Sequence, residues 1–220
     1  STVEHPAVNR RVVGSNPTLG ARISKIRFMR IFFYFHTLTP PSLPKLANTR
    51  NHAIVTSLPQ FTERQPMINI LFVCHGNICR SPMAEFVMKE RVRQAGLDAT
   101  VYVESAAMHR DEIGSDVHYG TKEILNRYGI PYEHRAARLA TTADYDKFDY
   151  IVGMDRYNMR DMMRLYHNDP DGKLSLLMDW VGASRDVADP WYTGDFDTTY
   201  EDVDAGCLAL VEHLKRILDH

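Results

Sequence analysis

The stretch Cys74-His75-Gly76-Asn77-Ile78-Cys79-Arg80-Ser81-Pro82 decides the fold of this chain. A continuous apolar run over residues 68–73 comes directly before it, as expected for a strand buried on both faces of a sheet. A helical pattern to about residue 95 follows, and its Ser-Pro beginning is typical of a helix N-terminus. Strand, loop and helix in this order indicate a parallel sheet, in which ligands bind at such loops.

The rest of the chain repeats this alternation. Further strands are predicted over residues 100–106, 148–154 and 174–178, and further helices over 117–128, 156–166 and 199–218. A long loop covers residues 179–197. Strands that alternate with helices form βαβ units, so we expect an α/β fold with a mostly parallel sheet covered by helices on both faces.

The loop after the first strand can form an anion site, because backbone N–H groups and a helix N-terminus both favour a bound phosphate. The residues expected around the phosphate are His75, Gly76, Asn77, Ile78, Cys79 and Arg80. Gly76 permits close backbone approach, and Asn77 tolerates a left-handed conformation.

Cys74 is the predicted nucleophile of this site. The amide dipoles and the Arg80 guanidinium both favour the thiolate over the thiol. Arg80 carries a planar fork that can hold two phosphate oxygens. Ser81 can donate a hydrogen bond to the Cys74 sulfur and can also cap the helix.

Two motifs carry a family resemblance: Cys-x-Gly-Asn-Ile-Cys-Arg-Ser-Pro and, far downstream, Asp189-Pro190-Trp191-Tyr192. With them, residues 67–220 resemble the low-molecular-weight protein-tyrosine phosphatases of bacterial type. The resemblance implies a four-stranded parallel sheet in three α/β/α layers. It also implies hydrolysis of phosphotyrosine in proteins through a cysteinyl-phosphate, with no metal or other cofactor. Cys74 would be the nucleophile, Arg80 would clamp the phosphate, and Asp189 would protonate the leaving oxygen and then activate water.

The same resemblance implies three supporting roles. His134 would hydrogen-bond Asn77, and Asp155 would orient His134. Cys79 would form a reversible disulfide with Cys74, which would protect the nucleophile from over-oxidation.

The substrate cleft departs from the family pattern at two places. Trp191 stands where the family usually has a tyrosine, and with Tyr192 it would form one aromatic wall. The opposite loop often supplies an aromatic residue in the family, but here polar residues including Asp111 fill it. The second wall of the cleft is therefore left undefined.

Other functions of the same fold stay open. A protein-arginine phosphatase is disfavoured because Ile78 stands where such enzymes tend to have threonine, and an apolar side chain suits a phenyl ring better than a guanidinium. An arsenate reductase needs further downstream cysteines, and none lies near residues 140–160. A non-enzymatic phosphate-binding module is disfavoured because Cys74, Arg80 and Asp189 are all present.

The charge distribution divides the chain at Met67. Residues 1–66 carry nine basic and two acidic residues, a net charge of +7, whereas residues 67–220 carry seventeen basic and twenty-six acidic residues, a net charge of −9. We expect residues 1–66 to be a non-native or disordered extension, from an over-extended reading frame or a targeting peptide, and residues 67–220 to form the phosphatase domain. The acidic domain disfavours nucleic acid as a partner.

The cysteine count and the apolar runs indicate the setting. Three cysteines do not make a disulfide framework and favour a reducing, cytoplasmic compartment. The longest apolar run, over residues 28–35, is far shorter than the ~20 residues that span a bilayer. We expect a monomer that does not bind membranes and whose partners are phosphotyrosine-containing proteins.

Overall fold

The computed structural model of the chain describes residues 67–219. The prediction of a disordered or non-native extension falls on residues 1–66 and lies outside the described residues. Among residues 67–219, every helix is too short or too polar to serve as a membrane span.

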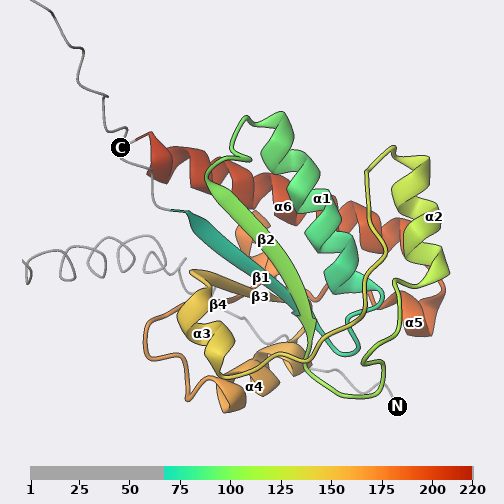
Figure 1. Cartoon of the computed structure of the whole chain (residues 1–220), viewed down its shortest axis with the longest axis horizontal. Helices are drawn as coiled ribbons and strands as arrows, with labels where there is room; N and C mark the ends of the chain where they lie inside the picture. The colour runs from blue at the N-terminus through green and yellow to red at the C-terminus, as the bar shows by residue number, and fades with distance from the viewer. Residues whose placement is uncertain (1–66, 220) are drawn as a thin grey trace, which may run out of the picture. The chain divides into compact units, whose positions relative to one another are not determined.

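Four parallel strands form one sheet in the order β2-β1-β3-β4. The strands are β1 Ile68–Cys74, β2 Val101–Ala107, β3 Tyr150–Gly153 and β4 Leu174–Leu176. Each lies within a residue or two of its predicted position, and the four-stranded parallel sheet is confirmed. Figure 1 shows the strands side by side at the centre of the described residues.

The helices are α1 Arg80–Gln94, α2 Tyr119–Arg127, α3 Ala143–Lys147, α4 Arg156–Leu165, α5 Pro190–Thr193 and α6 Phe196–Leu218, with a 3₁₀ helix, η2, at Leu177–Val181. The four longest were predicted. The three shortest, α3, α5 and η2, were not, because four or five residues are too few to display a helical period.

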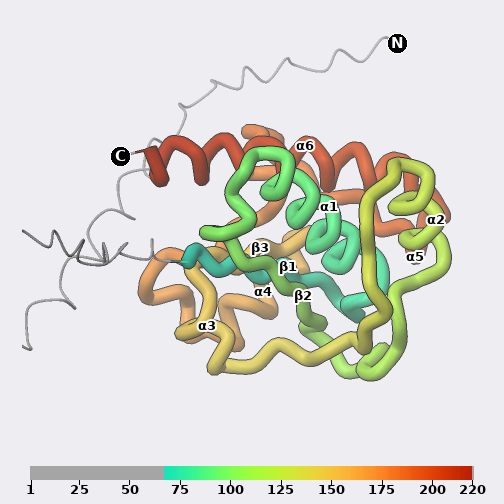
Figure 2. Tube along the Cα trace, turned by 45° about the horizontal axis from the view of Figure 1, so that its top comes forward, coloured from blue at the N-terminus to red at the C-terminus, as the bar shows by residue number. Residues whose placement is uncertain are grey.

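The two faces of the sheet bury alternate residues of β1. Ile70 and Phe72 pack among the apolar side chains of α1 and α6. Leu71 and Val73 pack on the other face, with Met162 of α4. Figures 1 and 2 show α1 and α6 on one side of the sheet and α3 and α4 on the other, so the three-layer arrangement with helices on both faces is confirmed.

The carboxyl ends of the strands meet at one edge, where β1 ends at Cys74 and α1 begins. The segment between α2 and α3 runs along this same edge (Figure 2), since the backbone N–H of Ala107 donates to the carbonyl of Arg138. One detail of the α1 start was wrong. Cys79, not Ser81, is the N-cap residue, and its side chain makes no capping hydrogen bond.

Candidate active site

Cys74 ends β1 with its side chain buried beneath the start of α1. Its Sγ lies 3.0 Å from Ser81 Oγ and accepts a hydrogen bond of 3.3 Å from the backbone N–H of Asn77. Asn77 has φ of 59°, the left-handed conformation predicted for it. The turn therefore brings an amide back over the sulfur.

Ser81 is held where its hydroxyl can donate a hydrogen bond to the sulfur. Asn77 Nδ2 donates to Ser81 Oγ at 2.9 Å and occupies an acceptor position of that oxygen. The hydroxyl hydrogen is then free to be donated to Cys74 Sγ. The contact between Ser81 and Cys74 that the sequence predicted is therefore present in the structure.

Arg80 lies at the centre of the charged groups. Its Nη1 is 2.5 Å from Asp155 Oδ2 and its Nη2 is 2.5 Å from Asp189 Oδ2. Burial works against the charged guanidinium, but Cys74 and the two carboxylates outweigh burial and raise the pKa of Arg80. Arg80 therefore stays a cation at every physiological pH, and Asp189 reaches the same site as Cys74.

The prediction for His134 was wrong. Its side chain is 84% exposed, and its Nδ1 is paired with Asp116 at 2.7 Å. The neighbouring residue takes the expected role instead, because Arg135 Nη2 donates to Asn77 Oδ1 at 2.6 Å. A guanidinium can bond several acceptors at once, whereas an imidazole offers two nitrogens.

Arg135 also neutralises a buried acid. Its Nη1 contacts Glu85 Oε2 and lies 2.5 Å from Ser105 Oγ. Ser105 in turn accepts from Asn77 Nδ2 at 2.8 Å and donates to Glu85 at 2.7 Å. Ser105 is 1% exposed and Glu85 5%, so this network is desolvated, and it ties the loop to α1 and β2.

The predicted partner of Asp155 was also wrong. Asp155 does not contact His134 but accepts a hydrogen bond from Arg80 through its Oδ2. Its Oδ1 caps α4 by accepting from the backbone N–H of Asn158 at 2.7 Å. Asp155 thus joins the start of α4 to the start of α1.

The segment that carries Asp189 is anchored on two sides. The backbone N–H of Val187 donates to the carbonyl of Met154 at 2.9 Å. Buried Asp202 of α6 accepts two bonds from Arg185 and one of 3.3 Å from the backbone N–H of Ala188. Asp189 then caps α5, since its Oδ1 accepts from the N–H of Trp191 at 3.1 Å.

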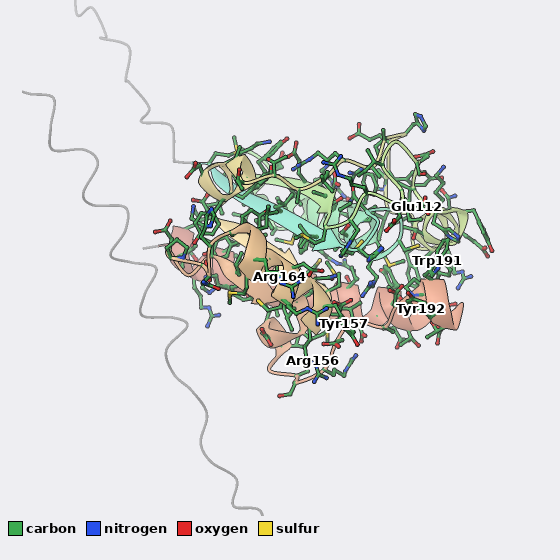
Figure 3. The ribbon with its side chains drawn as sticks, turned by 90° about the horizontal axis from the view of Figure 1, so that it is seen from below. Glu112, Arg156, Tyr157, Arg164, Trp191 and Tyr192 are labelled. Carbon is green, nitrogen blue, oxygen red and sulfur yellow. The ribbon has the colours of Figure 1, made fainter. Side chains whose placement is uncertain are left out.

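A cavity of about 980 Å³ opens above Cys74. Trp191, Tyr192 and Asp111 all line it, as predicted for cleft residues. Trp191 rests edge-on against the ring of His118, with ring centroids 6.1 Å apart. The opposite wall comes from Tyr157 of α4, which sequence reasoning missed. Figure 3 shows two groups of labelled side chains on this face: Arg156, Tyr157 and Arg164 on α4, and, apart from them, Glu112, Trp191 and Tyr192.

Among the described residues, one group at the opening of the cavity could be considered for a metal ion. It consists of His75, His109 and Asp111, whose potential ligand atoms lie within 4.8 Å of one another. The two imidazole rings stack at 4.2 Å and 14°. Their lone pairs lie in nearly parallel planes and do not converge on one ion. His75 Nε2 is instead paired with Asp111 at 2.7 Å.

The other two cysteines differ from Cys74 in surroundings. Burial, reinforced by the charge of Cys74, raises the pKa of the Cys79 thiol to about 12. Cys207 is fully buried on α6, where its Sγ donates to the carbonyl of Ala84 at 3.7 Å. Cys79 lines the cavity, whereas Cys207 belongs to the core.

The arrangement joins a sulfur nucleophile, a buried guanidinium and a carboxylate at one cavity, as attack of sulfur on a phosphate ester requires. A family model for low molecular weight phosphotyrosine protein phosphatase matches residues 69–219. The low molecular weight protein-tyrosine-phosphatase YfkJ of Bacillus subtilis is 38% identical over 152 residues, which are 68% of this chain and 97% of that protein.

Two solved structures agree with this result. The crystal structure of YfkJ has a TM-score of 0.67 and 37% identity, covering 70% of this chain and 98% of the other. SP-PTP, a low molecular weight protein tyrosine phosphatase from Streptococcus pyogenes, has a TM-score of 0.61 and 40% identity, covering 70% and 99%. The chain belongs to the low-molecular-weight protein-tyrosine phosphatase family, a group of phosphoric monoester hydrolases.

Proposed function

We propose that this chain removes phosphate from tyrosine side chains of proteins, with Cys74 as nucleophile, Arg80 as phosphate clamp and Asp189 as general acid and base. The observation that carries the proposal is the meeting of these three groups: Arg80 contacts Asp189 at 2.5 Å, and both line the cavity above Cys74.

The first step transfers the phosphoryl group to sulfur. The Cys74 thiolate, held by the Ser81 hydroxyl and the Asn77 amide, attacks phosphorus. A sulfur–phosphorus bond forms while the phosphorus–oxygen bond to tyrosine breaks. Asp189 gives its proton to the departing phenolate, which is a moderate leaving group and gains from protonation.

The second step regenerates the enzyme. Asp189, now ionised, takes a proton from a water molecule that attacks the cysteinyl-phosphate. The sulfur–phosphorus bond breaks, inorganic phosphate leaves, and the thiolate returns. Arg80 follows the phosphate charge through both steps because its pKa is raised and its planar fork can hold two oxygens.

Two neighbouring activities receive less support. Ile78 is buried against Cys79 and Ala137 and presents an apolar surface to the cavity, which suits a phenyl ring better than a phosphoguanidinium. Cys207 is bonded within the core, so it is poorly placed for the disulfide relay of an arsenate reductase.

The proposal includes the setting. A reducing compartment keeps a nucleophilic thiol free of disulfides, so we place the enzyme in the cytoplasm. There we expect it to act as a monomer on phosphotyrosine-containing proteins. Under peroxide, Cys74 would be oxidised to a sulfenic acid, and the Cys79 thiol would displace water from it to form a disulfide.

Peptides that differ only in the phosphorylated residue test this function. Phosphate release is expected from a phosphotyrosine peptide at least about 100-fold faster than from matched phosphoserine or phosphoarginine peptides. Cys74→Ser should abolish release while leaving the circular dichroism spectrum unchanged. Release from the phosphoarginine peptide at the higher rate would replace the proposal with the arginine phosphatase.

A further inference from the structure

The cavity above Cys74 is larger than a single phosphotyrosine requires. Its volume of about 980 Å³ lies at the upper end of the range for pockets that hold whole drug-sized ligands. The nucleophile loop forms one end, and α4 forms another through Tyr157, Arg160 and Arg164. The part next to α4 is therefore available to a neighbouring residue of the substrate.

Arginines recur every fourth residue along α4, at positions 156, 160 and 164. This spacing places them on one side of the helix. Arg160 and Arg164 line the cavity, and Arg156 is paired at its edge with Asp186 at 3.4 Å. Figure 3 shows Arg156 and Arg164 along α4, with Tyr157 beside them.

The carboxylates near these arginines leave one guanidinium unpaired. Asp161 Oδ2 is engaged with His109 at 3.0 Å, and its Oδ1 is a distant 3.5 Å from Arg164. Arg160 makes no ion pair within residues 67–219, and its guanidinium lies 5.1 Å from the centroid of the Tyr157 ring. A cation held over an aromatic ring keeps its N–H donors at the edge of its plane, where an anion can bind.

Four carboxylates that line the cavity are paired with cationic or histidine side chains: Asp155 and Asp189 with Arg80, Asp161 with His109, and Asp186 with Arg156. Asp111 and Glu112 lie on the loop after β2, and Glu112 packs against the backbone of Gly76. An anionic side chain beside the phosphotyrosine is therefore repelled by this loop and attracted by α4.

We propose that Arg160 and Arg164 form a second anion subsite, which binds a carboxylate or phosphate on a residue next to the phosphotyrosine. This subsite rests on the proposed function, because it selects among phosphotyrosine substrates. Arginine binds both anions through paired N–H groups, so glutamate, aspartate or a second phosphotyrosine can occupy it. The enzyme accordingly prefers acidic tyrosine sites.

Peptides of one length with glutamate, glutamine or lysine flanking the phosphotyrosine test the subsite. The glutamate peptide is expected to show a kcat/KM about 3- to 20-fold above that of the glutamine peptide, as expected from one or two exposed ion pairs. The lysine peptide should be the poorest of the three. The preference should shrink as potassium chloride rises from 50 to 300 mM.

Two variants assign the preference to the arginines. Arg160→Gln combined with Arg164→Gln should remove the glutamate preference while leaving hydrolysis of p-nitrophenyl phosphate unchanged. Arg93→Gln is the matched control, because Arg93 lies in the last turn of α1, far from its active-site end, and should keep the preference. A glutamate preference that survives the double variant, or a wild type that favours lysine, would overturn the subsite.

Measurements of peptide binding test the subsite separately from the proposed hydrolysis. Affinities of the same peptides for Cys74→Ser report the subsite whether or not turnover occurs, whereas absent turnover by the wild type would contradict the proposed function alone. A doubly phosphorylated peptide that binds more tightly than the glutamate peptide would identify a phosphate as the better occupant. Equal affinity would show that a carboxylate suffices.

Discussion

Arg80 and Asp189 are in contact, with Nη2 and Oδ2 2.5 Å apart, although Arg80 begins the first helix, α1, and Asp189 is the N-cap of α5, more than 100 residues later. The contact brings the group that would bind phosphate to the group that would protonate the ester oxygen. Because Asp155 holds the other side of the guanidinium, Arg80 stays in place when Asp189 turns toward a substrate. The chemistry of Asp189 can therefore be tested without displacing Arg80.

The leaving group should reveal the role of Asp189. We expect Asp189→Ala to lower kcat/KM for phenyl phosphate, which reports the transfer of phosphate to sulfur, by about 10²–10⁴-fold, the usual contribution of a general acid. For p-nitrophenyl phosphate the loss should be less than about tenfold, since that leaving group departs without a proton. Initial rates with a series of aryl phosphates measure the difference.

Asp186→Ala serves as the control for this series, because Asp186 lies on the same segment and lines the cavity but is paired with Arg156. It should leave the dependence on the leaving group unchanged. An equal loss for all aryl phosphates in Asp189→Ala would remove Asp189 from the acid role.

Arg135 should matter far more than His134. Replacing Arg135 with methionine leaves buried Glu85 with Lys89 as its remaining cation and takes a donor from Asn77 and Ser105, so we expect a loss of about 2 kcal/mol in the free energy of unfolding. His134→Ala should change it by no more than about 0.5 kcal/mol, because the ring is exposed. Urea unfolding measures both.

The same pair of variants also tests the support of the nucleophile loop. Arg135→Met should lower kcat because Asn77 loses the bond to its side-chain oxygen. If His134→Ala proved the more damaging variant in either measurement, the assignment of Arg135 to this role would be wrong.

Ser81 should control how readily Cys74 is alkylated. Without the hydroxyl, the thiolate loses a hydrogen bond of a kind that contributes about 1.5–3 kcal/mol, so inactivation of Ser81→Ala by iodoacetate at pH 6 should slow by about 10- to 100-fold. Ser175→Ala is a matched variant of a buried serine outside the site, and it should react like the wild type. Equal rates for Ser81→Ala and Ser175→Ala would exclude the hydroxyl from this role.

Cys79 should resist alkylation where Cys74 reacts. A pKa of about 12 leaves only about 10⁻⁴ of the Cys79 thiol ionised at pH 8, and ionisation rises only as the pH approaches that value. Iodoacetamide at pH 8 should therefore label Cys74 alone, as read by peptide mass spectrometry. Labelling of Cys79 at a comparable rate would contradict its burial.

Peroxide should still join the two cysteines, because a sulfenic acid on Cys74 can be attacked by the neighbouring thiol. The wild type should recover activity with dithiothreitol after a brief peroxide treatment, whereas Cys79→Ser should not. Full recovery of Cys79→Ser would show that Cys79 does not protect the nucleophile.

The core of the fold could be predicted because it follows from local patterns. The buried strand before Cys74 and the helix after it determine where the loop lies, and parallel strands bring their carboxyl ends to one edge. Asp189 was assigned to the site by its family motif, and the structure places its carboxylate at the same cavity as Cys74.

The motif could not predict that Arg135, rather than His134, bonds Asn77. Both residues lie on an irregular segment, which has no helical or strand period to indicate which side chain points toward the site. One signal was available. Glu85 lies in the first turns of α1, where Lys89 pairs with one of its oxygens, and burial of its other oxygen calls for a further donor such as Arg135. The cleft-facing side of α4 was similarly undetermined, although the spacing of its arginines was visible.

Asp189 is both the candidate acid and the N-cap of α5, so the reactive carboxylate and the aromatic side chains of Trp191 and Tyr192 travel as one unit. We therefore expect a substrate that displaces the two aromatic side chains to displace the carboxylate of Asp189 as well. The leaving group of a poorly fitting ester would then not be protonated, so the enzyme would select substrates by the rate of turnover as well as by affinity.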